Sequence, residues 1–152
     1  MDSVRVWMSA PPIVARDTMT LPVARQLLAE QNICRLPVVN EQDELIGIVT
    51  EGDINRISDA PAGDLVEYRP GQQVKDLPLR AFMRRPVLTV TPATCLREAA
   101  QLMIEQHIHG VPVVLGKQVV GVLTVSDLLR WMVESETEVG TVTMGPRSVA
   151  RD

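Results

Sequence analysis

The sequence predicts an α/β (α+β) protein built from two copies of one β-α-β-β-α unit, and three observations lead to this fold class. Residues 37–39 (PVV) recur 75 positions later as residues 112–114, and residues 47–53 (GIVTEGD) recur 74 positions later as residues 121–127 (GVLTVSD). In each copy, short apolar runs typical of β-strands surround one segment with helical periodicity. Motifs that return in the same order indicate a repeated structural unit.

This repetition divides the chain into four parts. The first repeat covers residues 4–57 and the second covers residues 79–133, because residues 4–8 (VRVWM) also resemble residues 79–83 (LRAFM). Residues 58–78 are predicted to be a linker from their prolines and glycines, and residues 134–152 a flexible tail. A chain of 152 residues can bury a sufficient core without disulfides.

The first repeat is predicted to contain a strand at residues 12–15, a helix at 22–31, strands at 36–39 and 45–50 around a polar turn, and a last helix at 52–58. Its strands are apolar throughout, which is typical of a sheet covered by helices.

The second repeat shows the same order more clearly. Residues 86–90 form a β-rich run, and residues 96–106 place apolar side chains at helical spacing, with Thr94 as the expected N-cap. Residues 111–115 and 119–124 flank the turn at Gly116 and Lys117 and predict a hairpin. Residues 126–133 predict the final helix.

Composition limits the classes of function. The net charge of −4 argues against a broad nucleic-acid surface, and no apolar run reaches the roughly 18–20 residues of a membrane span. The two cysteines form no disulfide framework and the start of the chain lacks a signal peptide, so we expect a soluble cytoplasmic protein. His107 and His109 lack a third ligand for a metal, and no nucleophile–base motif predicts an enzyme or a catalytic cofactor.

A hydroxyl and a carboxylate lie three residues apart where a strand runs into the last helix of each repeat, as Thr50 and Asp53 and as Thr124 and Asp127. A carboxylate can accept hydrogen bonds from both hydroxyls of a ribose, and a helix N-terminus attracts a phosphate. Ser126 adds a hydroxyl there. The same spacing also predicts a capping box, in which Thr caps the helix and Asp is its third residue. The two interpretations are compatible.

Two pairs of motifs recur in the chain: residues 36–39 (LPVV) with 47–53, and residues 111–114 (VPVV) with 121–127. In this order and spacing they resemble the tandem cystathionine-β-synthase (CBS) domain family. The resemblance covers nearly the whole chain apart from the linker and tail. The resemblance implies a stand-alone module whose two repeats pack with pseudo-twofold symmetry around two clefts. It also implies adenosine-containing ligands such as AMP, ADP or ATP, pairing into flat homodimers, and regulation of an unidentified partner protein.

The remaining candidate site residues lie on the strands. The residues expected to line a largely apolar slot for a purine are Ala15, Leu36 and Pro37 in the first repeat and Thr89, Val111 and Pro112 in the second. The resemblance implies that the residues before each Pro-Val strand also reach the ligand, namely Arg35, His109 and Gly110. Arg35 suits a phosphate by bidentate bonding or, alternatively, a surface ion pair.

The repeats differ in ways that favour the second as the main site. Ala15 replaces the hydroxyl of Thr89, and Glu51 places a negative charge where the second repeat has Val125. These changes also leave open an alternative function, a dimerisation or docking scaffold that binds no ligand.

Overall fold

The computed structural model describes residues 2–58 and 73–135, so most of the predicted tail and most of the predicted linker lie outside the described residues, while residues 134 and 135 end the last helix. The mixed α/β fold class is confirmed. The elements in chain order are α1 (Val4–Trp7), β1 (Ala15–Arg16), α2 (Leu21–Gln31), β2 (Arg35–Val39), β3 (Leu45–Thr50), α3 (Glu51–Ser58), the 3-10 helices η2 (Val74–Asp76) and η3 (Leu79–Ala81), α4 (Leu96–Gln106), β4 (Gly110–Leu115), β5 (Gln118–Thr124) and α5 (Val125–Ser135).

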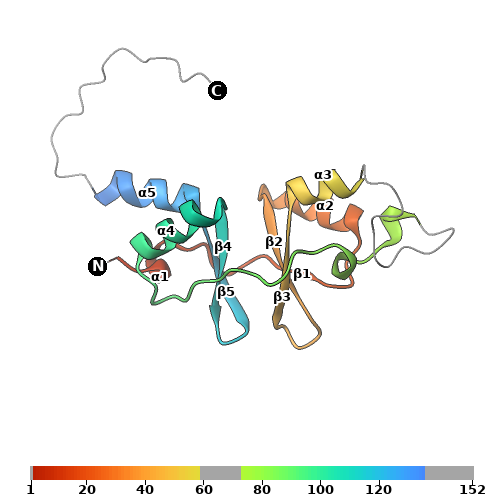
Figure 1. Ribbon diagram of the computed structural model, residues 1–152, viewed down its shortest axis with the longest axis horizontal. Coiled ribbons are helices and arrows are strands. Elements are labelled where there is room, and N and C mark those ends of the chain that lie inside the picture. The colour runs from red at the N-terminus through yellow and green to blue at the C-terminus, as the bar shows by residue number, and fades with distance from the viewer. Residues whose placement is uncertain (1, 59–72, 136–152) are drawn as a thin grey trace, which may run out of the picture.

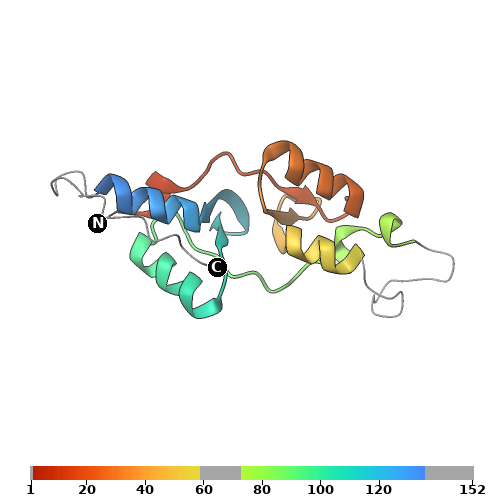
Figure 2. The same cartoon turned by 90° about the horizontal axis from the view of Figure 1, so that it is seen from above.

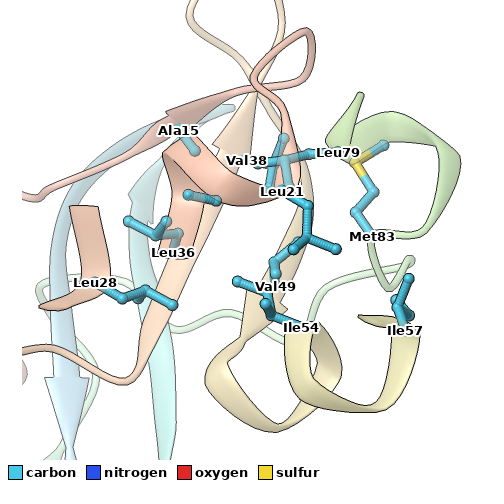
Figure 3. Packing of buried hydrophobic residues seen from close by; sticks show 11 residues of the cluster. Ala15, Leu21, Leu28, Leu36, Val38, Val49, Ile54, Ile57, Leu79 and Met83 are labelled. Carbon is cyan, nitrogen blue, oxygen red and sulfur yellow. The ribbon is translucent and has the colours of Figure 1, made fainter. Parts of the chain in front are cut away.

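The first half of the molecule is a three-stranded sheet packed against α2 and α3 (Figure 1). Strand β1 runs parallel to β2, and β2 pairs antiparallel with β3, with a register shift between Val38 and Val39. Leu28 of α2 and Ile54 of α3 meet Leu36 and Val49 of the strands in one buried apolar cluster (Figure 3). The first half therefore has its own core.

The second half repeats this arrangement around the antiparallel pair β4 and β5, packed with α4 and α5. The predicted strand at residues 86–90 is wrong in extent, because only Val90 pairs, in a parallel bridge to Val113. The predicted strand at 12–15 is likewise shifted, since β1 begins at Ala15. Both segments contain prolines, which lack the N–H group that a ladder needs.

The opening segment of each repeat crosses to the other half. Strap 1 (residues 2–13) carries α1 to the second half, where Val4 is fully buried with Val111 and Leu123. Strap 2 (residues 73–88) carries η3 to the first half, where Leu79 and Met83 enter the core (Figure 3). Figure 2 shows α1, in red, beside the blue helix α5. The repeats defined by sequence are therefore not the packing units.

The helix starts differ slightly from the predictions. The N-cap of α4 is Cys95, while the Thr94 hydroxyl accepts a hydrogen bond from the N–H of Thr91 at 3.0 Å and closes a turn. Helices α3 and α5 each begin one residue before the predicted start. Among the described residues, no helix combines the length and apolar character needed to cross a bilayer.

Candidate functional site

Both Thr-x-x-Asp motifs form capping boxes. The N–H of Asp53 donates to the Thr50 hydroxyl at 3.1 Å, and the N–H of Thr50 donates back to Asp53 Oδ2 at 3.1 Å. The second motif has the same pair, with 2.8 Å from the N–H of Thr124 to Asp127 Oδ2 and 3.4 Å from the N–H of Asp127 to the Thr124 hydroxyl. The capping interpretation of the sequence is therefore confirmed, and it leaves one carboxylate oxygen in each motif for other partners.

That second oxygen has different partners in the two halves. Asp127 Oδ1 accepts one bond, from Arg130 at 3.1 Å, and Asp53 Oδ1 accepts the corresponding bond from Arg56 at 3.2 Å. Asp53 Oδ1 additionally accepts a 2.7 Å bond from Arg84 Nε of strap 2. The first motif thus carries an extra ion pair, although both carboxylates are similarly buried, at 2% and 3% exposure.

These contacts make Asp53 a source of acid sensitivity. Burial by itself raises the pKa of Asp53, but hydrogen bonds from Thr50 and the guanidinium of Arg84 together outweigh it and hold the pKa below its usual value. A lowered folded pKa contributes stability above the unfolded pKa of about 3.9, and this contribution is lost as pH falls through the folded value.

We therefore expect the urea midpoint of unfolding to drop more steeply below about pH 4 in the wild type than in Asp53→Asn. The difference between the two proteins isolates this carboxyl from the other acidic groups. Parallel curves from pH 6 to pH 3 would show that Asp53 makes no such contribution.

Two clefts of similar size lie beside the capping boxes. Cleft 1 has a volume of about 620 Å³ and lies at the start of α5. Its walls combine strap 1, the loop before β2, and the junction of β5 with α5. It is lined by Ser9, Pro11, Pro12, Ile13, Asn32, Ile33, Cys34, Arg35, His109, Val122, Thr124, Val125, Ser126, Asp127 and Arg130. Volumes of this size are typical of small-molecule sites.

Cleft 2 has a volume of about 610 Å³ and lies at the start of α3. It is built in the same way from strap 2, the loop before β4, and the junction of β3 with α3. It is lined by Cys34, Arg35, Ile48, Thr50, Glu51, Gly52, Asn55, Arg84, Pro86, Val87, Leu88, His107, Ile108, His109, Gly110 and Pro112. Asp53 is absent from this lining, whereas Asp127 lines cleft 1.

The structure distributes the predicted site residues unevenly. Thr124, Ser126 and Asp127 line cleft 1, and Thr50, Gly110 and Pro112 line cleft 2. Arg35 and His109 line both clefts. Five others lie in the interior, all of them buried: Ala15, Leu36, Pro37, Asp53 and Val111. Thr89 lines a separate hollow of about 350 Å³ beside β4.

Thr89 and Asp127 line different hollows, because each cleft takes one wall from the strap of the other repeat. Cleft 1 joins the capping box of the second repeat to Pro11, Pro12 and Ile13 of the first. Sequence reasoning missed these strap residues and their equivalents in cleft 2. The similarity between residues 4–8 and 79–83 could have pointed to these strap residues, because Ser9 and Arg84 directly follow the two similar segments. It does not reveal that each strap packs against the other half of the molecule.

Arg35 occupies the boundary between the clefts. Its guanidinium lies so close to Gly110 that a Cβ at that position would be 2.5 Å from Arg35 Nη1. Burial lowers the pKa of Arg35, and neighbouring Cys34 acts in the opposite direction; the group remains charged at neutral pH. No acidic side chain among the described residues forms an ion pair with Arg35. A partly desolvated cation of this kind is suited to an anionic ligand.

Within residues 2–58 and 73–135, no group of three or more His, Cys, Asp or Glu side chains is placed to hold a metal ion.

Comparison with known families and sequences gives consistent matches. The family model of the CBS domain matches residues 3–59 and residues 74–134. An uncharacterized protein of Methanocaldococcus jannaschii, MJ1404, is 32% identical over 80% of this chain, and L-aspartate semialdehyde sulfurtransferase of the same organism is 32% identical over 84%. The chain spans only 30% and 22% of those two relatives. A CBS domain-containing protein of Dictyostelium discoideum is 30% identical over 76% of this chain and 80% of its own length.

Solved structures show the same fold. The CBS domain pair of protein MJ0100, in complex with 5′-methylthioadenosine and S-adenosyl-L-methionine, has a TM-score of 0.74 and 29% identity, covering 89% of this chain and 98% of its own. A putative acetoin utilization protein from Vibrio cholerae has a TM-score of 0.76 and 26% identity over 93% of this chain and 99% of its own. CBSX2 in complex with AMP has a TM-score of 0.77 at 22% identity, over 90% of this chain and 99% of its own.

Proposed function

Because this chain belongs to the CBS domain family, we propose that it is a regulatory module that binds an adenosyl ligand in cleft 1 and thereby changes the state of a partner protein. One observation carries the proposal. Cleft 1 places the carboxylate of Asp127, at the start of α5, in the same cavity as the charged side chain of Arg35. A carboxylate that can accept from ribose hydroxyls and a cation for an anionic group thus share one space of ligand size.

The walls of cleft 1 divide by chemistry. Pro12, Ile13 and Val122 provide apolar surface for a purine. Asp127 accepts from the ribose, and the exposed Ser126 hydroxyl and Arg35 are available to the group on the 5′ carbon. This arrangement supports an adenosyl compound over a free base or a free phosphate, each of which would use only part of the cleft.

A similar solved structure supports the class of ligand proposed here. The MJ0100 pair, which is 29% identical to this chain, was crystallised with two adenosyl compounds that carry sulfur on the 5′ carbon. This similarity supports an adenosyl ligand in general and favours no particular 5′ substituent. AMP, ADP, ATP, 5′-methylthioadenosine and S-adenosylmethionine are therefore the probes to compare.

A thermal-shift panel with these five compounds tests the proposal. A ligand present at 100 times its Kd stabilises a protein by about 2.7 kcal/mol, which corresponds to several degrees in Tm for a domain of this size. We expect at least one compound to raise Tm at millimolar concentration. If none does, the module does not sense these ligands, and the alternative of a ligand-free dimerisation or docking scaffold is favoured.

The role of Arg35 can be tested separately with Arg35→Gln. We expect AMP affinity to fall about tenfold or more, because a charge-assisted bond to phosphate is lost. Adenosine affinity should change little, because adenosine has no phosphate. Arg97→Gln on the exposed face of α4 is the matched control for loss of one positive charge. Equal losses for AMP and adenosine would place Arg35 in shaping the cleft rather than in binding the anion.

We also propose that two copies pair through α5, whose Leu129, Met132 and Val133 are 54%, 55% and 72% exposed. A cluster of exposed apolar side chains on one helix is typical of an interaction surface. Light scattering should give twice the chain mass for the wild type. Met132→Glu with Val133→Glu should give the mass of one chain, and an unchanged mass would exclude α5 as the interface.

A further inference from the structure

Ser9 and Arg84 occupy equivalent positions in the two halves. The N–H of Ser9 donates to the Val122 carbonyl at 2.9 Å, and the N–H of Arg84 donates to the Ile48 carbonyl at 2.9 Å, with a reciprocal bond in each case. Val122 and Ile48 each lie two residues before the Thr of a capping box. Each strap therefore places one residue at the equivalent position near a capping box. This residue is Ser9 in cleft 1 and Arg84 in cleft 2.

The other contacts of the two carboxylates are alike, except that Asp127 Oδ2 also accepts a 3.1 Å bond from the Thr124 hydroxyl. Each accepts a bond from the backbone of its capping Thr, and each pairs with an arginine three residues later, Arg56 or Arg130. Among the described residues, the 2.7 Å bond from Arg84 Nε to Asp53 Oδ1 is the ion pair that Asp53 has and Asp127 lacks. The walls of the two clefts differ accordingly. Arg84 lines cleft 2 and Asp53 does not, whereas both Ser9 and Asp127 line cleft 1.

A ribose in cleft 2 would have to compete with this guanidinium. In the pair of Arg84 with Asp53 both donor and acceptor are charged, so Coulomb attraction adds to the hydrogen bond, and Asp53 is only 2% exposed. Ribose hydroxyls are neutral donors, and displacing Arg84 would leave a buried carboxylate with less compensation for its charge. The competition therefore favours the internal ion pair.

Building on the function proposed above, we propose that Arg84 takes the place of a ribose at Asp53, so that cleft 1 is the adenosyl site and cleft 2 is closed to nucleosides. Arg84 is thus a specificity-determining residue: its guanidinium satisfies the carboxylate that a nucleoside would otherwise use. The strap residue at this position decides whether a cleft accepts a ribose. Ser9 allows a ribose in cleft 1, and Arg84 prevents it in cleft 2.

Exchanging these two residues tests the inference. Stoichiometry per chain is measured by isothermal titration with AMP and, in parallel, with adenosine, which has the same ribose without a phosphate. We expect one site in the wild type, two in Arg84→Ser, and none in Ser9→Arg. The double variant Arg84→Ser with Asp127→Asn should retain one site, now at cleft 2. Circular dichroism and Tm of each free variant establish that it is folded.

The two histidines of the chain report which cleft is filled, because His107 lines cleft 2 alone and His109 lines both. In NMR spectra of the imidazole C–H groups, AMP should shift His109 and not His107 in the wild type, and should shift both in Arg84→Ser. Two equal sites in the wild type would contradict the proposed role of Arg84. A single site in Arg84→Ser, at ligand concentrations ten times those that saturate the first site, would contradict it as well. Either result would leave the proposed function of cleft 1 in place. Absence of binding by every folded variant would instead overturn the proposed function, and this inference with it.

Discussion

Asp127→Asn is expected to lower the affinity for AMP by about a hundredfold. Asparagine keeps the size of the side chain and can still accept a bond from the N–H of Thr124, so the start of α5 is preserved. Loss of the carboxylate removes two charge-assisted hydrogen bonds from the ribose, each of which contributes about 1.5 kcal/mol, or about 3 kcal/mol together. Isothermal titration of the two proteins measures the change directly.

Asp53→Asn is the matched control, because Asp53 occupies the same position in the other capping box. It removes the charge of a buried carboxylate that pairs with the exposed Arg84 and accepts the capping bond from Thr50, so we expect a loss of thermal stability. AMP affinity should stay within about twofold of the wild type, since cleft 1 is untouched. Normal AMP binding by Asp127→Asn, or equal losses in both variants, would contradict ligand recognition by Asp127.

Replacing Gly121 with valine is expected to destabilise the fold by about 3 kcal/mol, as overpacking of a tight contact does. A Cβ at this position would lie 2.6 Å from Met8 Sδ and 3.0 Å from the carbonyl oxygen of Ser9, so strap 1 could not keep its place. Gly47 has the same relation to Met83 of strap 2. Gly47→Val should therefore produce a comparable loss, measured as the free energy of unfolding in urea.

Gly52→Ala serves as the control for these two substitutions. The nearest atom to a Cβ there is Thr50 Oγ1 at 3.8 Å, and Gly52 is an exposed residue in the first turn of α3. Alanine in a helix favours folding over glycine by about 0.5–1 kcal/mol, so a small gain in stability is expected. If Gly121→Val unfolds no more easily than the wild type, the straps do not depend on close approach to the strand.

The hairpin strands and the longer helices could be predicted because their signals are local. Leu45–Thr50 and Leu96–Gln106 have the predicted bounds, since apolar periodicity and turn residues within each segment define them. The first strand of each repeat was placed less well, because Ala15 and Val90 pair with strands far along the chain. Whether such short runs pair depends on those partners rather than on their own residues.

The sequence by itself determined the repeat, the two capping boxes and the residues available for a ligand, because each depends on residues close together in the chain. Only the tertiary structure decided which residues share a cleft. The straps exchange between the halves, so Asp127 shares its cleft with Ser9 and Pro12, and Asp53 pairs with Arg84, 31 residues away. Contacts over such separations are selected by the packing of Val4 and Leu79 into opposite cores, which no local pattern encodes.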